Sequence, residues 1–224
     1  MIRSVLLDLD GTLVRSNEAH AEAWRDALAE RGKTPPFDEV RRAIGRGGDQ
    51  LLPLFLTEAE IAEWGEALKE RRGEIFAQNY LHRVEPIPGA REFVASLLER
   101  GLSVALGSSA TSEELAMLAR VGGLDDLPIA VTTSDDAERS KPEPDIWRAA
   151  MAKIGAEPAT TAIVGDTPYD AEAATKAGLR AVGVLSGGWS RGELGDAGFV
   201  EVYADVAELN ARLAESLIGE GDPA

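Results

Sequence analysis

The 224-residue chain contains no cysteine, which excludes disulfide bonds, a thiolate nucleophile and a sulfur-ligated metal site. No apolar run approaches the ~20 residues that a membrane-spanning helix needs, so we expect no such helix. Cations are scarce as well, because 23 Lys and Arg face 39 Asp and Glu and leave a net charge of −16. This balance argues against binding to nucleic acid or to a membrane surface. The N-terminal residues lack the basic segment and apolar core of a signal peptide, so we expect a cytoplasmic protein.

Five short apolar segments are typical of strands buried in a parallel sheet. Helical patterns separate the last four of them, and this alternation predicts βαβ units with right-handed crossovers. The predicted fold is therefore α/β, with a Rossmann-like parallel sheet sandwiched by helices. The expected strands are residues 4–8, 102–107, 129–132, 162–165 and 181–184, and the expected helices are residues 91–100, 113–120, 145–154, 168–177 and 206–217.

Residues 15–85 interrupt this alternation. They contain helical patterns and no convincing strand, and they are too many for one crossover. We therefore predict an α-helical subdomain inserted after the first strand, with residues 1–14 and 86–224 forming the α/β core. The helical patterns cover residues 18–31, 37–44, 50–56 and 58–80.

Polar residues follow the predicted strands at the points where these end. Asp8 and Asp10 follow the first strand, Ser108 and Ser109 follow the second, and Asp166 follows the fourth. Lys141 lies in a polar segment after the third strand. Because the carboxyl ends of parallel strands meet at one edge of a sheet, we expect these side chains to converge there.

The chemistry of these side chains fits phosphoryl transfer. Asp8 can act as a nucleophile, and Asp10 can protonate the leaving oxygen and then activate water. The Ser108 hydroxyl and the Lys141 ammonium can bind non-bridging phosphate oxygens. Asp166 can join Asp8 on a hard cation with oxygen ligands, which predicts Mg²⁺.

In order and spacing, these four segments resemble the haloacid dehalogenase superfamily of phosphohydrolases. The resemblance covers the whole chain, including a helical cap inserted just after the first strand, as in the phosphoglycolate phosphatase and β-phosphoglucomutase group. It implies that Asp8 is nucleophile and metal ligand, and that Asp10 is acid/base with its backbone carbonyl on the metal. It also implies phosphoryl binding by Ser108, Ser109 and Lys141, metal binding by Asp166, and a supporting carboxylate behind these ligands at Asp170.

Two of these residues have a structural alternative. Asp170 completes Thr167-x-x-Asp170, and Pro168 stands at the first helical position, so it is a good helix start in its own right. Ser108 could cap the helix that follows it.

Three parts of the inserted subdomain are candidates for substrate binding. The glycine-rich loop around Arg46 and Gly47 resembles the substrate-specificity loop of the same group, although a flexible surface loop would look similar. Arg72 lies on the apolar stripe of its helix, so it either reaches out to water or faces a polar cleft. His20 matches a position near the hinge and the acid/base in that group, although a structural histidine is the alternative.

We therefore predict a Mg²⁺-dependent hydrolase of small phosphomonoesters, phosphoglycolate or a sugar phosphate, that acts through an aspartyl phosphate. A phosphosugar mutase of the β-phosphoglucomutase type is the alternative, because it uses the same core residues. A 2-haloacid dehalogenase is disfavoured by Asp10, which that branch typically replaces. The expected partner is a small phosphorylated metabolite, and the expected state is a monomer or a weak dimer.

Overall fold

The computed structural model describes residues 1–219, which contain a six-stranded parallel sheet. The strand order is β5-β4-β1-β6-β7-β8, and every neighbouring pair is parallel. The strands are β1 (Ser4–Leu7), β4 (Ser103–Gly107), β5 (Ala130–Thr132), β6 (Thr161–Gly165), β7 (Arg180–Val184) and β8 (Phe199–Tyr203). The predicted α/β fold class and all five predicted strands are confirmed.

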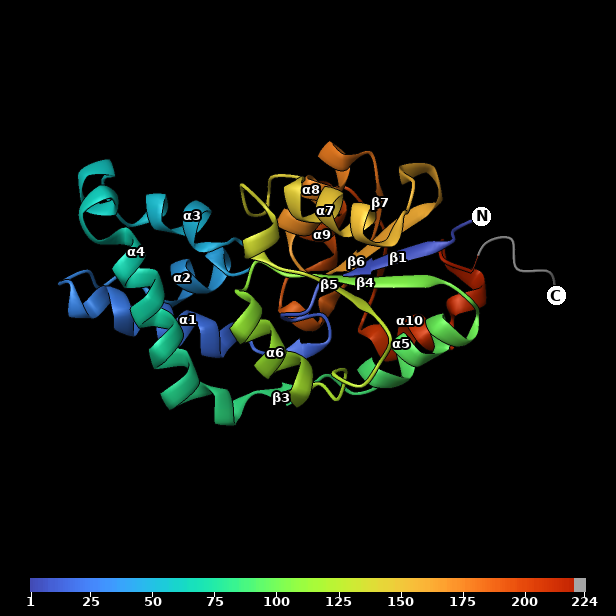
Figure 1. The fold of residues 1–224 in the computed structure, drawn as a ribbon, viewed down its shortest axis with the longest axis horizontal. Coiled ribbons are helices and arrows are strands. Elements are labelled where there is room, and N and C mark those ends of the chain that lie inside the picture. The colour runs from blue at the N-terminus through green and yellow to red at the C-terminus, as the bar shows by residue number, and fades with distance from the viewer. Residues whose placement is uncertain (220–224) are drawn as a thin grey trace.

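Helices cover both faces of the sheet (Figure 1). On one face lie α7 (Asp145–Ile154), α8 (Pro168–Ala177) and α9 (Arg191–Ala197). On the other lie α5 (Ala90–Glu99), α6 (Ser112–Val121) and α10 (Val206–Ala211). Side chains of β1 alternate between these layers, because Val5 and Leu7 belong to one apolar cluster and Leu6 to the other.

Three features near the C-terminus differ from the predictions. The edge strand β8 was missed because it carries exposed Val200 and half-buried Glu201 and so lacks a continuous apolar run. The short helix α9 was also missed, since its two glycines weaken the helical pattern. The last helix ends at Ala211 and is followed by a 3₁₀ turn, Leu213–Glu215, so the predicted end at Leu217 is wrong.

Between β1 and β4, the regular elements of residues 16–84 are helical. They are α1 (Asn17–Glu30), α2 (Phe37–Ala43), α3 (Gly48–Leu51) with a 3₁₀ turn (Leu52–Leu54), and α4 (Glu58–Ile75), which continues as one π-helical turn (Phe76–Tyr80) and a 3₁₀ turn (Leu81–Arg83). We call residues 16–84 the helical insert; its helices lie together beyond the carboxyl ends of the strands (Figure 1).

The two chain segments that connect the insert to the sheet lie side by side. β2 (Val14–Arg15) and β3 (Glu85–Pro86) pair as an antiparallel ribbon, with Val14 opposite Pro86 and Arg15 opposite Glu85. The division into a core of residues 1–14 and 86–224 and a cap of residues 15–85 stays a prediction. None of the helices within residues 1–219 has the length and apolar character needed to span a bilayer.

Substitution of Gly107, at the end of β4, would test the packing between this strand and α7. A Cβ atom there would collide with the indole ring of Trp147, which is fully buried on α7. We expect Gly107→Ala to lower the free energy of unfolding by about 1–3 kcal/mol, as overpacking does. Urea unfolding followed by tryptophan fluorescence measures the change.

Gly195→Ala in α9 is the matched control. Within residues 1–219, no atom beyond the chain neighbours and the backbone of its own helix lies within 4 Å of the Cβ position at Gly195, so the added methyl meets open space. Replacing this helical glycine should raise stability by about 0.5–1 kcal/mol. A Gly107→Ala protein as stable as the wild type would contradict the packing described for Trp147.

Candidate active site

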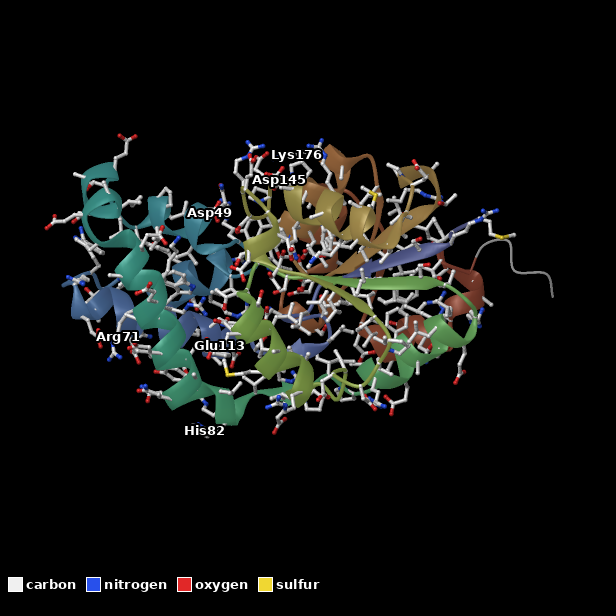
Figure 2. The ribbon with its side chains drawn as sticks, in the orientation of Figure 1. Asp49, Arg71, His82, Glu113, Asp145 and Lys176 are labelled. Atoms are coloured by element: carbon white, nitrogen blue, oxygen red, sulfur yellow. The ribbon has the colours of Figure 1, made fainter. Side chains whose placement is uncertain are left out.

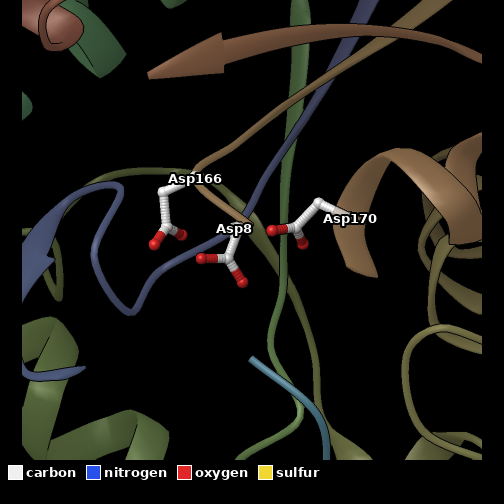
Figure 3. Close-up of side chains that lie close together, drawn as sticks. All are labelled: Asp8, Asp166 and Asp170. Atoms are coloured by element: carbon white, nitrogen blue, oxygen red, sulfur yellow. The ribbon is translucent and has the colours of Figure 1, made fainter. Parts of the chain in front are cut away.

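Three buried carboxylates meet at the carboxyl edge of the sheet (Figure 3). Asp8 directly follows β1, Asp166 follows the neighbouring strand β6, and Asp170 lies in the first turn of α8. One oxygen from each lies within 4.8 Å of the other two. Their exposed fractions are only 5%, 0% and 1%, so solvent does little to screen their mutual repulsion. We call these three residues the acidic cluster.

Lys141 supplies a buried cation to the acidic cluster. Its Nζ lies 2.5 Å from Asp8 Oδ1 and 2.8 Å from Asp170 Oδ1. The same nitrogen lies 4.5 Å from the centroid of the Trp147 ring, whose π face favours a cation. One ammonium group balances one of three carboxylate charges, which leaves the cluster short of positive charge.

The pKa values reflect this shortage. Burial raises the pKa of Asp8 to about 7; Lys141 opposes the rise, while Asp170 and Asp10 add to it. Burial, followed by repulsion from Asp8 and Asp170, holds the pKa of Asp166 well above its usual value. Burial disfavours the charged form of Lys141, but Asp170 and Asp8 outweigh this effect and raise its pKa.

The acidic cluster fits a hard divalent cation. Carboxylate oxygens are the ligands that Mg²⁺ prefers, and a cation would relieve the repulsion that raises these pKa values. Asp166 is held in place by Thr12 Oγ1, which donates to its Oδ1 at 3.1 Å, and by Asn17 Nδ2, which donates to its Oδ2 at 2.9 Å. A Cβ atom at Gly187 would collide with this carboxylate, so glycine leaves the room that it needs.

Asp10 has different surroundings from Asp8, although only one residue separates them. The hydroxyl of Ser16 donates to Asp10 Oδ1, and His20 Nε2 lies 2.9 Å from the same oxygen. Ser108 Oγ donates to Asp10 Oδ2 at 3.4 Å. Burial opposes ionisation of Asp10, but His20 and Ser16 together hold its pKa below the usual value. Two neighbouring carboxyl groups therefore have pKa values shifted in opposite directions.

Ser108, Ser109 and Asp170 lie at or beside the same edge. Ser108 is fully buried, and its Oγ accepts from the Ala110 N–H at 3.1 Å while donating to Asp10. Ser109 Oγ donates to the carbonyl of Gly45 in the insert at 3.5 Å. Asp170 Oδ2 accepts from the N–H and hydroxyl of Thr167, at 3.1 and 2.7 Å, while Oδ1 faces Lys141. The helix-start arrangement and the site contact therefore coexist.

The glycine-rich loop of the insert lies over the strand ends. A small cavity of about 40 Å³ lies between this loop and Asp8 and Asp10. Gly47 packs so closely on Ser140 that a side chain would collide with it. The Arg46 guanidinium lies over the Tyr169 ring of α8, 4.2 Å from its centroid.

Arg72 faces this cavity and pairs with a residue that sequence reasoning missed as part of the site. Its Nη1 lies 2.8 Å from both carboxylate oxygens of Glu114 on α6. The pattern Thr111-x-x-Glu114 is typical of a capping box, but only half of the box forms, because Thr111 Oγ1 accepts from the Glu114 N–H while the Glu114 carboxylate turns to Arg72. The position of Arg72 on an apolar stripe indicated a polar cleft as one alternative, and the structure places the Glu114 carboxylate there.

The family model of the haloacid dehalogenase-like hydrolases matches residues 2–178. The chain belongs to the haloacid dehalogenase-like hydrolase family. A relative named phosphoglycolate phosphatase, from Rhodospirillum rubrum, is 30% identical over 218 residues, which cover 93% of this chain and 90% of that protein. The resemblance to this family is thus confirmed.

Solved structures agree with the family. A hydrolase from Pseudomonas syringae is 31% identical, with a TM-score of 0.87 over 95% of this chain and 98% of the other. A haloacid dehalogenase family hydrolase from Deinococcus radiodurans, solved with bound phosphate and sodium, is 29% identical. Its TM-score is 0.72 over 100% of this chain and 99% of the other.

Repulsion within the acidic cluster should lower the free energy of unfolding of this hydrolase when no metal is bound. Asp166→Asn removes one charge and keeps the shape of the side chain. In EDTA at about pH 8, we expect the variant to have a free energy of unfolding about 1–2 kcal/mol higher than wild type. Wild-type stability falls as pH rises through the raised pKa of Asp166, so the difference should shrink toward about pH 4.

Urea unfolding at several pH values measures this difference. Asp196→Asn, an exposed aspartate on α9, is the control and should leave stability unchanged. Saturating Mg²⁺ should reverse the order, because wild type binds it more tightly than the variant. A variant less stable than wild type in EDTA at all pH values would show that Asp166 is not under electrostatic strain.

Proposed function

We propose that the protein is a Mg²⁺-dependent phosphatase that hydrolyses a small phosphomonoester, phosphoglycolate or a sugar phosphate, through an aspartyl phosphate on Asp8. The observation that carries the proposal is the separation of two neighbouring carboxylates into different surroundings. Asp8 lies in the acidic cluster beside Lys141, whereas Asp10 is held by His20 and Ser16. Such a pair suits covalent phosphoryl transfer, in which one carboxylate attacks phosphorus and the other moves a proton.

Asp8 and Asp166 would hold the Mg²⁺, with the backbone carbonyl of Asp10 as a further ligand. When bound, the ion would neutralise charge on the phosphoryl group and favour the ionised form of Asp8. Asp170 is not assigned as a metal ligand, because Lys141 and Thr167 already contact its two oxygens. It holds the Lys141 ammonium beside Asp8, where this group can bind a non-bridging phosphate oxygen.

The reaction has two steps. First, with Asp10 in its protonated form, an Asp8 oxygen bonds to phosphorus, the bond from phosphorus to the ester oxygen breaks, and Asp10 gives that oxygen its proton. Second, Asp10 takes a proton from water as the water attacks phosphorus, and the Asp8–phosphorus bond breaks. The ester and water become an alcohol and phosphate, and both aspartates return to their starting states. Ser108 and Ser109 at the end of β4 would complete the phosphoryl-binding set.

Substitution of the two aspartates tests the mechanism. Asp8→Asn should abolish steady phosphate release from an alkyl phosphate, because an amide does not form the covalent ester. Asp10→Asn should lower kcat by about 10²–10⁴-fold, because it removes the proton donor and acceptor. Asp196→Asn should retain wild-type kcat, and thermal unfolding checks that each variant is folded. Unchanged turnover in Asp8→Asn would refute the mechanism.

Removal of the metal and analysis of products distinguish the other candidates. We expect EDTA to abolish phosphate release and added Mg²⁺ to restore it. Isomerisation of glucose 1-phosphate without phosphate release would instead identify a mutase of the β-phosphoglucomutase type. Release of halide from a 2-haloacid in EDTA would identify a dehalogenase.

A further inference from the structure

Glu114 brings a fourth buried carboxylate close to the proposed acid/base. It lies on α6, outside the acidic cluster, with an exposed fraction of only 5%. Its Oε1 is 3.4 Å from His20 Nδ1, and His20 Nε2 is 2.9 Å from Asp10 Oδ1. A single imidazole ring thus separates Glu114 from Asp10. The proposed mechanism assigns Glu114 no role, so its burial at this place calls for another explanation.

Glu114 also neutralises Arg72. Nη1 of Arg72 lies 2.8 Å from both Glu114 oxygens, in a buried pair that connects α4 of the insert with α6 of the sheet layer. Among residues 1–219, no acceptor bonds to Arg72 Nε, although this atom is buried. The pair therefore presents an acceptor carboxylate, carries little net charge, and leaves the Arg72 guanidinium with no free charge for a second anion. The Arg72 guanidinium carbon lies 5.1 Å from the Trp24 ring centroid, which adds an apolar wall.

The pair lies where the alcohol part of a substrate would lie. Arg72 and Glu114 line the small cavity of about 40 Å³ over Asp8 and Asp10, and they also line a larger cavity of about 810 Å³ beside it. An ester oxygen that receives its proton from Asp10 would direct the rest of the alcohol into this space. The walls that both cavities share are Trp24, Gly48, Arg72, Ser109 and Glu114.

The charges in this space disfavour a carboxylate on the substrate. Such a group only accepts hydrogen bonds, and it would meet the Glu114 carboxylate and an arginine that is already paired. Arg46, the other arginine of the small cavity, stacks on Tyr169 on the β6 side of the site, whereas Glu114 lies on the β4 side. A hydroxyl group suits the pair better, because it can donate to the Glu114 carboxylate and adds no negative charge.

We propose that Glu114 makes this site selective for phosphomonoesters of uncharged, polyhydroxylated alcohols, such as sugar and polyol phosphates, and selective against esters that carry a carboxylate, such as phosphoglycolate. This inference rests on the proposed phosphatase function, since it concerns the leaving group that Asp10 protonates. It makes Glu114 a specificity residue that works largely by repulsion.

A matched pair of substrates tests the proposal on the wild-type protein. Phosphoglycolate and 2-hydroxyethyl phosphate differ at one group only, which is a carboxylate in phosphoglycolate and a hydroxymethyl group in 2-hydroxyethyl phosphate. With Mg²⁺ present, we expect kcat/KM to be at least about tenfold higher for 2-hydroxyethyl phosphate, which is the range expected for one unfavourable charge contact. Glycerol 3-phosphate should exceed 3-phosphoglycerate in the same way, and p-nitrophenyl phosphate reports phosphatase activity without either group.

The Glu114→Gln variant provides a second test, in which the same two substrates are compared. It keeps an acceptor oxygen but frees the Arg72 charge, so the preference for 2-hydroxyethyl phosphate should fall about tenfold or reverse. Glu113, the neighbouring residue on α6 (Figure 2), lines the larger cavity and so cannot serve as the control. Glu172→Gln is the control instead, because Glu172 is exposed on α8 and lines neither cavity. It should leave the preference unchanged. Thermal unfolding checks both variants, and the wild-type comparison stands without either of them.

The outcomes separate the inference from the function on which it rests. Wild type that hydrolyses p-nitrophenyl phosphate but uses phosphoglycolate as well as 2-hydroxyethyl phosphate would overturn the inference alone. A folded Glu114→Gln protein with the wild-type preference would also overturn it. Failure to release phosphate from any of these esters with Mg²⁺ would instead overturn the phosphatase function, and the inference with it.

Discussion

The contact between the Lys141 ammonium and the carboxylates of Asp8 and Asp170 is the interaction on which the rest of the site depends. Without this cation, burial of three carboxylates within a few ångströms of each other would be too costly. With it, two charges of the cluster still lack a partner, and burial, with repulsion between the carboxylates added to it, raises the pKa values of Asp8 and Asp166. The surrounding fold keeps the deficit in place, because rigid strand ends and a helix start hold each carboxylate. The unbalanced charge of the acidic cluster therefore favours the binding of a cation.

Much of this arrangement could be predicted from local sequence. Buried parallel strands appear as apolar runs, and the residues directly after them must lie at one edge of the sheet. This geometry is why Asp8 and Asp166 could be placed together without a structure, whereas Lys141 lies in the loop between β5 and α7 and was placed with them through the resemblance to the family. The helix start at Asp170 could also be predicted, since Thr167-x-x-Asp170 is a local pattern. Its second contact, with Lys141, depends on the way the loop before α7 folds back, which no local pattern indicates.

The features that were missed depend on contacts between distant segments. Glu114 follows a good capping signal, Thr111-x-x-Glu114, and only the approach of Arg72 from the insert turns its carboxylate away from the helix end. The edge strand β8 has a neighbour on one side only, so its sequence lacks the apolar run that identifies the inner strands. In both cases the local pattern fits two structures, and tertiary packing decides between them.

The antiparallel pairing of β2 with β3 brings the two ends of the helical insert to adjacent points of the chain. An insertion whose ends meet can be lengthened, shortened or exchanged without changing the order of strands in the sheet. Asp8, Lys141 and Asp166 lie outside the insert, while Arg46 and Arg72 lie within it. Under the proposed function, the insert can therefore vary in evolution while the residues at the strand ends stay the same. In this chain the division is incomplete, because Glu114 belongs to the sheet layer yet pairs with Arg72 of the insert. Substitutions at positions 72 and 114 should therefore covary among related sequences.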